Sequence, residues 1–335
     1  MYGIAKIPSS DREDLFRNTA QKMKLHEAIV EKDFWVCWVL DYLFHRCAWK
    51  DSFTFKGGTS LSKGYDLIQR FSEDIDLIMD WGLIGYEQDE PWKERSKTKQ
   101  DAFNKEANRL TENFLGGDFI ETLKQDFSNL LCTDANLHID AVNKQTIRFA
   151  YPRTLSDTSI LQEICLEIGT LAAWTPAEQV LIEPYAAKQY PQLFDSTETS
   201  VLTVKPERTF WEKVTILHRE ANRNGTALPQ RYSRHYYDLY CMSQSEVKEK
   251  AFSEIDLLKK VVAFKEKFYP CAWAKYEDAK IGSMKLMPKE EYIEGLKSDY
   301  QHMRNMIYGD QPPFEDVLNE IEKMEVEINA LQIKN

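Results

Sequence analysis

A chain of 335 residues with 43% hydrophobic and 29% charged residues can bury a sizeable core and has the composition of an ordinary globular protein. Its net charge of −11 argues against a surface coated with basic residues for indiscriminate nucleic-acid binding. The six cysteines include no Cys-x-x-Cys pair, which favours free thiols in a reducing compartment over disulfides or zinc. With no signal-peptide core and no apolar run long enough for a bilayer, we expect a cytoplasmic protein without a membrane partner.

The first part of the chain predicts helices. Residues 10–48 follow helical spacing, with Ser10 as a candidate cap and a strongly apolar second half. Glu31, Lys32 and Asp33 interrupt that apolar half. For these three charges we favour a solvated patch at the flank of the helix, and a role in binding substrate is the alternative.

A glycine turn follows the first expected strand. Residues 53–55 predict that strand, and Gly57-Gly58 then allow a tight turn and the close approach of another group. Thr59 and Ser60 add hydroxyl donors where a helix is expected to begin. The amides at the start of a helix favour an anion such as phosphate.

The next strand carries paired carboxylates. Alternation from Ile75 predicts that Asp74 and Asp76 point to the same side of a strand. Two hard carboxylates suit Mg²⁺ or Mn²⁺, because Mg²⁺ prefers one or two carboxylates plus substrate phosphates. The order Lys63-Gly64 excludes a P-loop, and the apolar Ile78 argues against a calcium-binding EF-hand loop. The alternative is a half-buried strand with solvated acids.

A family resemblance rests on these motifs, which read Phe55-Lys56-Gly57-Gly58-Thr59-Ser60-Leu61 and Arg70-x-Ser72-x-Asp74-x-Asp76. Together they resemble the signature of DNA polymerase β-like nucleotidyltransferases, specifically the AbiEii toxin family of bacterial toxin–antitoxin systems. The resemblance implies an α/β (α+β) fold with a mixed sheet flanked by helices and a C-terminal helical lobe. It also implies an NTP substrate, whose phosphates Gly57, Gly58, Thr59, Ser60 and Ser72 would cradle.

Residues 81–159 predict a helical excursion and a hairpin. A polar segment leads into a helix over residues 100–131, with a break at Gly116-Gly117. Residues 137–140 and 145–149 then alternate as two strands around a turn. We interpret His138 in the first of these strands as structural, because no second histidine stands at metal-ligand spacing.

A further strand is expected over residues 160–169, with Glu163, Cys165 and Glu167 on one face. A site that binds two metal ions needs a third carboxylate. In polymerase β-like enzymes that acid comes from a neighbouring strand, so the resemblance points to Glu167. Glu163 faces the same way and stays open as the alternative.

After a last short strand at residues 201–204, Pro206 opens a helix that runs to about Ala221. Lys213 lies on it near the apolar stripe, where a lysine can bind nucleotide phosphates or extend to water. Residues 208–213 resemble the third motif of the family, whose lysine contacts the nucleotide. Residues 231–239 resemble its fourth motif, whose aspartate, here Asp238, completes the site. Without the resemblance Asp238 is interpreted as a surface acid.

Basic residues outnumber acidic ones between residues 205 and 234, with aromatic residues interleaved. This local excess is the best candidate for a nucleotide or RNA surface on an acidic protein. The alternative is a set of solvated helix faces with pairs such as Arg208 and Glu212.

Three more helices are expected, over residues 251–269, 288–308 and 313–331, with an irregular loop at 270–287. We therefore expect a nucleotidyltransferase domain with leading helices over residues 1–205 and a C-terminal helical domain over 206–335.

Together these features predict an Mg²⁺-dependent enzyme that moves a nucleoside monophosphate from an NTP to an acceptor and releases pyrophosphate. Asp74, Asp76 and Glu167 would serve the metal, and Lys213 would offset developing charge. By the resemblance the acceptor is RNA, in particular the 3′ end of a tRNA, and the role is that of a growth-inhibiting toxin with a cognate antitoxin. Two alternatives remain: a non-catalytic nucleotide- or RNA-binding module, and an enzyme that modifies a small molecule, as antibiotic nucleotidyltransferases do.

Overall fold

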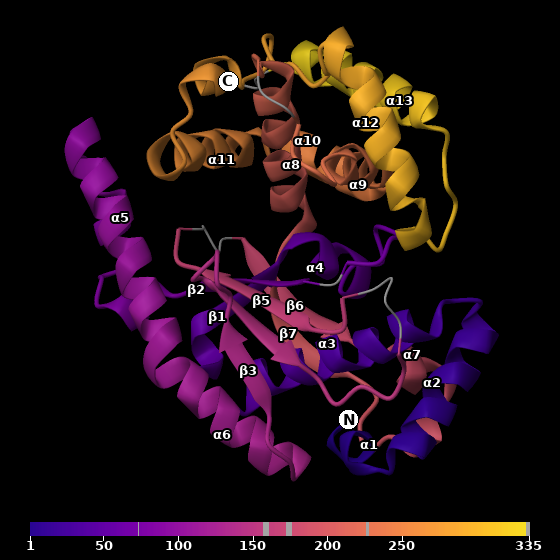
Figure 1. The fold of residues 1–335 in the computed structure, drawn as a ribbon. Coiled ribbons are helices and arrows are strands. Elements are labelled where there is room, and N and C mark those ends of the chain that lie inside the picture. The colour runs from indigo at the N-terminus through magenta and orange to yellow at the C-terminus, as the bar shows by residue number, and fades with distance from the viewer. Residues whose placement is uncertain (73, 157–160, 172–175, 226–227, 333–335) are drawn as a thin grey trace. The chain divides into compact units, whose positions relative to one another are not determined.

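The structure, a computed structural model, describes residues 1–72, 74–156, 161–171, 176–225 and 228–332. It contains a seven-stranded mixed sheet (Figure 1), whose strands follow the order β3-β4-β5-β2-β1-β7-β6. The strands are β1 (Phe53–Lys56), β2 (Asp74–Met79), β3 (Asn136–Ile139), β4 (Thr146–Ala150), β5 (Ile164–Gly169), β6 (Ala177–Ile182) and β7 (Thr199–Val204). The expected fold class, a mixed sheet flanked by helices with a helical C-terminal part, is confirmed.

The chain divides into two compact units. The first unit comprises residues 1–64 and 72–203, and the second comprises residues 65–71 and 204–335. The division at 203/204 lies two residues from the expected boundary at 205/206. The assignment of residues 65–71 to the second unit was not expected from the sequence.

The helices of the first unit are α1 (Tyr2–Lys6), α2 (Ser9–Met23), α3 (Glu27–His45), α4 (Gly57–Lys63), α5 (Lys97–Phe114), α6 (Ile120–Leu131) and α7 (Tyr185–Gln189). A π-helical turn at Leu115–Phe119 joins α5 to α6, so the two form one nearly continuous stretch (Figure 1). That turn contains the expected break, because Gly117 departs from helical geometry. The predicted hairpin of β3 and β4 is confirmed as an antiparallel pair.

The core of the first unit lies between α3 and one face of the sheet. The alternation of β1 and β2 places their buried apolar side chains on that face, where they pack with Trp35 and Trp38 of α3. The opposite face of the same strands carries Asp74 and Asp76. Amphipathic alternation therefore decides which side of the sheet is available for a polar site.

Some expectations for the first helices were wrong. Ser10 is not a cap, because α2 begins at Ser9 after Pro8, and the Ser10 hydroxyl donates to Asp11 instead. The charged residues of α3 are not a solvated patch. Glu31, Lys32 and Asp33 are all buried, with 0%, 0% and 3% of their surface exposed.

Each buried charge of α3 has a specific partner. Glu31 accepts hydrogen bonds from the Thr154 amide and hydroxyl, and Lys32 donates to the carbonyl of Leu161 at 2.6 Å. Asp33 forms an ion pair of 2.6 Å with Lys63 at the end of α4. These bonds satisfy charges that would otherwise be costly to bury, and they attach α3 to distant segments of the unit.

Strand predictions were mostly right in position. β7 confirms the expected strand at 201–204. β6 was missed because its apolar and polar residues do not alternate: two polar residues stand together and three apolar residues follow them. The strand expected over 160–169 is observed as β5 from Ile164, and Ile160 lies outside the described residues. None of the described helices is long and apolar enough to cross a membrane.

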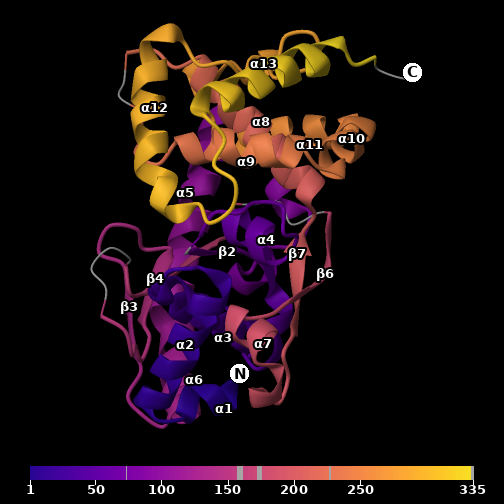
Figure 2. The ribbon, with the colours of Figure 1, turned by 90° about the vertical axis from the view of Figure 1, so that its right-hand side faces the viewer.

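The regular elements that the structure describes in the second unit, apart from the end of β7, are helices. These helices are α8 (Pro206–Ala221), α9 (Ser233–Ser243), α10 (Glu246–Ser253), α11 (Ile255–Phe268), α12 (Glu290–Met303) and α13 (Phe314–Ala330). α8 and α9 contact each other at the centre of this unit (Figure 2). α8 also contacts α10 and α11, and α9 also contacts α10, α12 and α13. Pro206 stands at the first position of α8, as expected.

Candidate active site

The sheet register brings three acids to one face of the first unit. Asp76 of β2 pairs with Lys56 of β1 on one side and with Glu167 of β5 on the other. Asp74 pairs with Cys165 in the same ladder. Directly paired residues present their side chains on the same face, so Asp74, Asp76 and Glu167 share the polar face of the sheet.

Glu163, the alternative third acid, occupies a different environment. It precedes β5 and forms an ion pair of 3.3 Å with Arg148 of β4. The same guanidinium binds Asp140 at 2.5 Å. The Asp140 carboxylate also accepts the Asn143 amide, and this bond together with Arg148 lowers its pKa. Glu163 is therefore engaged with the hairpin, whereas Glu167 is the residue in register with Asp76.

Gly57 is required where the chain turns from β1 into α4. Its φ angle is +84°, a conformation that favours glycine. A Cβ atom at this position would lie 1.8 Å from Oδ2 of Asp76. The absent side chain thus leaves the space that the Asp76 carboxylate occupies, which is the close approach predicted for the glycine turn.

The hydroxyls of the turn bond to the backbone. Thr59 donates to the carbonyl of Asp74 at 2.5 Å, and Ser60 donates to the carbonyl of Gly57 at 2.8 Å. Both residues are buried, and a hydroxyl has one proton to donate. The expectation that these two hydroxyls donate to phosphate is corrected accordingly. The Thr59 hydroxyl joins α4 to β2, and the Ser60 hydroxyl bonds within the first turn of α4. Gly58 and Ser72 are half-buried.

The donor set fits a magnesium ion shared with a substrate. Within the described residues, no group of three or more His, Cys, Asp or Glu side chains is arranged to hold a metal ion. Mg²⁺ does not need such a group, because it commonly takes one or two carboxylates and completes its shell with water and phosphate oxygens. Asp74 and Asp76, two hard ligands on one face, match that requirement.

A buried charge cluster lies in the second unit. Asp238 of α9 accepts two hydrogen bonds from Arg70, at 2.6 Å from Nε and 2.8 Å from the terminal nitrogen Nη2. Lys213 of α8 donates to the same carboxylate at 2.6 Å. Asp238 has no exposed surface, Arg70 is 4% exposed and Lys213 is 6% exposed. We call these three residues the Asp238 cluster.

The charges of the cluster determine its protonation. Burial by itself would raise the pKa of Asp238, but Arg70 and Lys213 outweigh burial and hold that pKa well below its ordinary value. Burial lowers the pKa of Lys213, and Asp238 opposes this shift without cancelling it. Asp238 is therefore an ionised acceptor that orients both cations.

The structure excludes the solvent-exposed positions considered for Lys213 and Asp238. Lys213 does not extend to water, because its ammonium is buried against Asp238, and Asp238 is not a surface acid. The pair of Arg208 with Glu212 is present at 3.1 Å, but Arg208 is buried, so this face of α8 is not simply solvated. Sequence reasoning assigned Arg70 no role. It stands in the quoted motif, yet nothing in the spacing links it to a residue 168 positions later.

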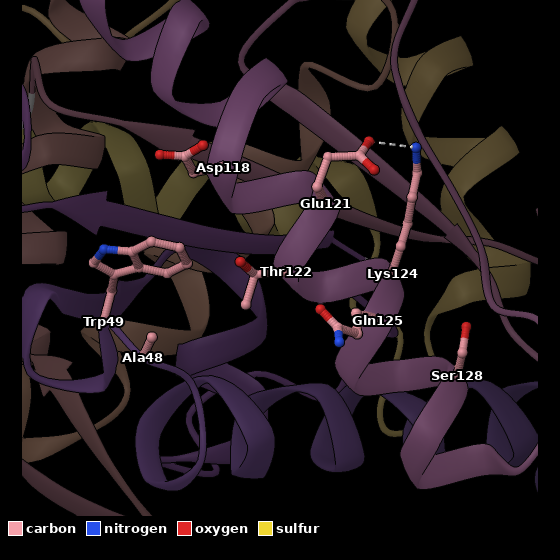
Figure 3. Close-up of a pocket in the computed structure, with 8 residues that line it drawn as sticks. All are labelled: Ala48, Trp49, Asp118, Glu121, Thr122, Lys124, Gln125 and Ser128. Atoms are coloured by element: carbon pink, nitrogen blue, oxygen red, sulfur yellow. Dashed lines mark hydrogen bonds and ion pairs between the residues drawn. The ribbon is translucent and has the colours of Figure 1, made fainter.

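A surface pocket of 720 Å³ lies elsewhere in the first unit (Figure 3). It is lined by Ala48, Trp49, Asp118, Glu121, Thr122, Lys124, Gln125 and Ser128. Glu121 and Lys124 bind each other at 2.9 Å along α6. None of the lining residues is one of the predicted site residues, so this pocket does not mark the candidate active site.

A mixed sheet that presents paired carboxylates beside a glycine turn defines an α/β protein with a polar candidate site on one face of its sheet. Residues 38–320 match the profile of a family described as nucleotidyl transferase AbiEii toxin, type IV toxin–antitoxin system. The chain therefore belongs to the AbiEii family of nucleotidyltransferase toxins, and the expected resemblance is confirmed.

The chain also has a similar solved structure at low sequence identity. Its structure is similar to that of MenT4, a nucleotidyltransferase toxin from Mycobacterium tuberculosis H37Rv, with 14% identity and a TM-score of 0.41. The similarity covers 94% of this chain and 99% of MenT4. No curated protein matches the sequence.

Proposed function

We propose that this toxin transfers a nucleoside monophosphate from an NTP to the 3′ end of an RNA, with tRNA as the expected acceptor, and that a cognate antitoxin neutralises it. The observation that carries the proposal is the register of Asp76 with Glu167 beside Asp74, with Gly57 making room for the Asp76 carboxylate. Family membership supports the reaction type. The RNA acceptor rests on the family resemblance alone, and the cytoplasmic location on the cysteine pattern and apolar runs of the sequence.

In the proposed reaction the acceptor oxygen bonds to the α-phosphorus and the bond to the β-phosphate breaks, so pyrophosphate leaves. Asp74 and Asp76 would hold Mg²⁺ or Mn²⁺, which when bound would neutralise phosphate charge. Glu167, across the ladder from Asp76, would take the acceptor proton or add a ligand. The backbone of Gly57 and Gly58, with Ser72, would lie along the phosphates.

Lys213 would offset negative charge on the nucleotide phosphates. Asp238 is its one hydrogen-bond partner among the described residues, which leaves two N–H donors of the ammonium for a ligand. Asp238 has no exposed surface, and both of its oxygens are bonded to Arg70 or Lys213. We therefore propose that Asp238 positions Lys213 for the nucleotide.

The carboxylates are tested by matched substitutions. We expect Asp76→Asn to abolish transfer from labelled NTP to total bacterial RNA, because it removes a metal ligand. Glu167→Gln should slow transfer by about two orders of magnitude or more, the usual contribution of a positioned base. Glu163→Gln is the matched control, since Glu163 binds Arg148 instead. Unchanged transfer by Asp76→Asn, or loss confined to Glu163→Gln, would refute the assignment.

The acceptor is tested separately. If RNA receives the label at its 3′ hydroxyl, prior oxidation of the RNA with periodate removes the signal. Label on a small molecule would instead identify an antibiotic-type transferase. Nucleotide binding without transfer to any acceptor would identify a non-catalytic binding module.

A further inference from the structure

The Asp238 cluster contains more positive than negative charge. Arg70 and Lys213 share one carboxylate, and the three groups are almost completely buried. Arg234, which lies one helical turn before Asp238 on α9, adds a third cation to the same neighbourhood. An excess of buried positive charge is costly unless an anion compensates it.

His235 lies one helical turn from Asp238 on α9 and has a buried atom without a hydrogen-bond partner among the described residues. It precedes Asp238 by three positions on α9, so the two side chains lie on the same side of the helix. Its ring is half-buried and packs edge-to-face against Tyr232 at 4.8 Å. Its Nδ1 atom is buried and has no hydrogen-bond partner among the described residues. Buried side-chain nitrogens are normally bonded, so this one calls for a ligand.

The surroundings keep His235 neutral without such a ligand. Burial lowers its pKa most, and Lys213, Arg234 and Arg70 lower it further. Asp238 acts in the opposite direction and raises the pKa of His235. A bound anion would add the missing negative charge and make a protonated imidazole favourable.

We propose that His235 is a phosphate-binding residue of this toxin, which donates a hydrogen bond from Nδ1 to a polyphosphate held by Lys213 and takes up a proton from solvent when that anion binds. The proposal rests on the proposed function and names the group that recognises the nucleotide's phosphates. Three cations around one carboxylate favour a ligand with several negative charges, which a nucleotide polyphosphate has. An RNA backbone has one charge per phosphate.

The experiment measures binding of inorganic pyrophosphate, without metal, by calorimetry in two buffers with different heats of ionisation. We expect the wild type to bind pyrophosphate more tightly at about pH 6 than at about pH 8 and to take up protons. His235→Gln should bind pyrophosphate about tenfold more weakly and take up fewer protons. Protons taken up by pyrophosphate itself are the same for both proteins, so they cancel when the variant is compared with the wild type. The matched control is His302→Gln, an exposed histidine of α12.

A second measurement needs no substitution at the site. In wild-type protein with ¹³C-labelled histidine, the ring signal of His235 should titrate at a higher pH once pyrophosphate is added. An unchanged titration would overturn the proposal, as would equal proton uptake by wild type and His235→Gln. So would an effect of His235→Gln on binding of a short single-stranded RNA but not on pyrophosphate. Pyrophosphate binding with proton uptake by a protein that transfers no nucleotide would support this inference while refuting the proposed function.

Discussion

Gly57 has both a left-handed backbone and a close neighbour, whereas Gly85 has the left-handed backbone without the neighbour. Gly57 and Gly85 have the same φ of +84°. A Cβ atom at Gly57 would collide with the Asp76 carboxylate, whereas nothing lies within 4 Å of a Cβ atom built at Gly85. The two residues therefore separate backbone strain from the loss of space at the candidate site.

We expect Gly57→Ala and Gly85→Ala to lose similar stability from strain, about 1–2 kcal/mol for a left-handed alanine. Gly57→Ala should in addition slow nucleotide transfer by about two orders of magnitude, because the Asp76 carboxylate must move. Thermal melting and transfer rates of both variants test this. Normal transfer by Gly57→Ala, or equal loss by Gly85→Ala, would show that the carboxylate does not need this position.

At the scale of elements, the Asp238 cluster connects α8, α9 and the segment 65–71. Lys213 comes from α8, Asp238 from α9 and Arg70 from the segment. None of these elements is joined to another by a short turn that would predict the contact. The carboxylate is common to every bond of the cluster, so its charge holds the three elements together.

Asp238→Asn should destabilise the protein by about 3 kcal/mol at neutral pH, because two buried cations lose their counter-charge. The pKa of Asp238 is lowered in the folded state, so its contribution is complete above the unfolded value of about 3.9 and is lost as the pH falls below it. Urea unfolding at about pH 7 and about pH 3 should therefore show a difference between variant and wild type that shrinks in acid.

The control for this prediction is Asp256→Asn on α11. Asp256 is exposed and pairs with Lys259 at 2.8 Å, so its replacement should change stability by less than about 0.5 kcal/mol. A difference between Asp238→Asn and wild type that is constant with pH would contradict the charge argument.

At the scale of the whole molecule, residues 65–71 belong to the second unit although both neighbouring segments belong to the first. The Phe71 amide donates to the Met306 carbonyl at 2.6 Å, and the Tyr308 amide donates to the Gln69 carbonyl at 3.0 Å. Arg70 adds its bonds to Asp238. The second unit is therefore incomplete without a piece of chain from the middle of the motif region.

A fragment of residues 204–335 should accordingly be less stable than the same fragment with residues 65–71 attached through a long flexible linker. The attached segment restores the partner of Asp238 and the backbone bonds to residues 306–308. Melting followed by circular dichroism compares the two. Replacing Arg70 by Met in the linked fragment should remove most of the gain, and equal melting of all three fragments would show that the segment adds nothing.

The sequence by itself determined the elements whose signals are local. Alternation predicted β1, β2 and the hairpin, Pro206 marked the start of α8, and Gly57 marked a close approach. Family motifs added the choice of residues at the candidate site. These features follow from periodicity and backbone geometry, which neighbouring residues set.

Only the tertiary structure decided which charges are buried and what they bind. Sequence spacing predicted that Glu31, Lys32 and Asp33 form a solvated patch and that Asp238 is a surface acid. All four residues are buried. The position of Glu167, and not Glu163, opposite Asp76 likewise depends on the register of β2 with β5. The physical reason is that burial and ion pairing depend on partners far along the chain, such as residue 63 for Asp33 and residue 70 for Asp238, which no local pattern contains.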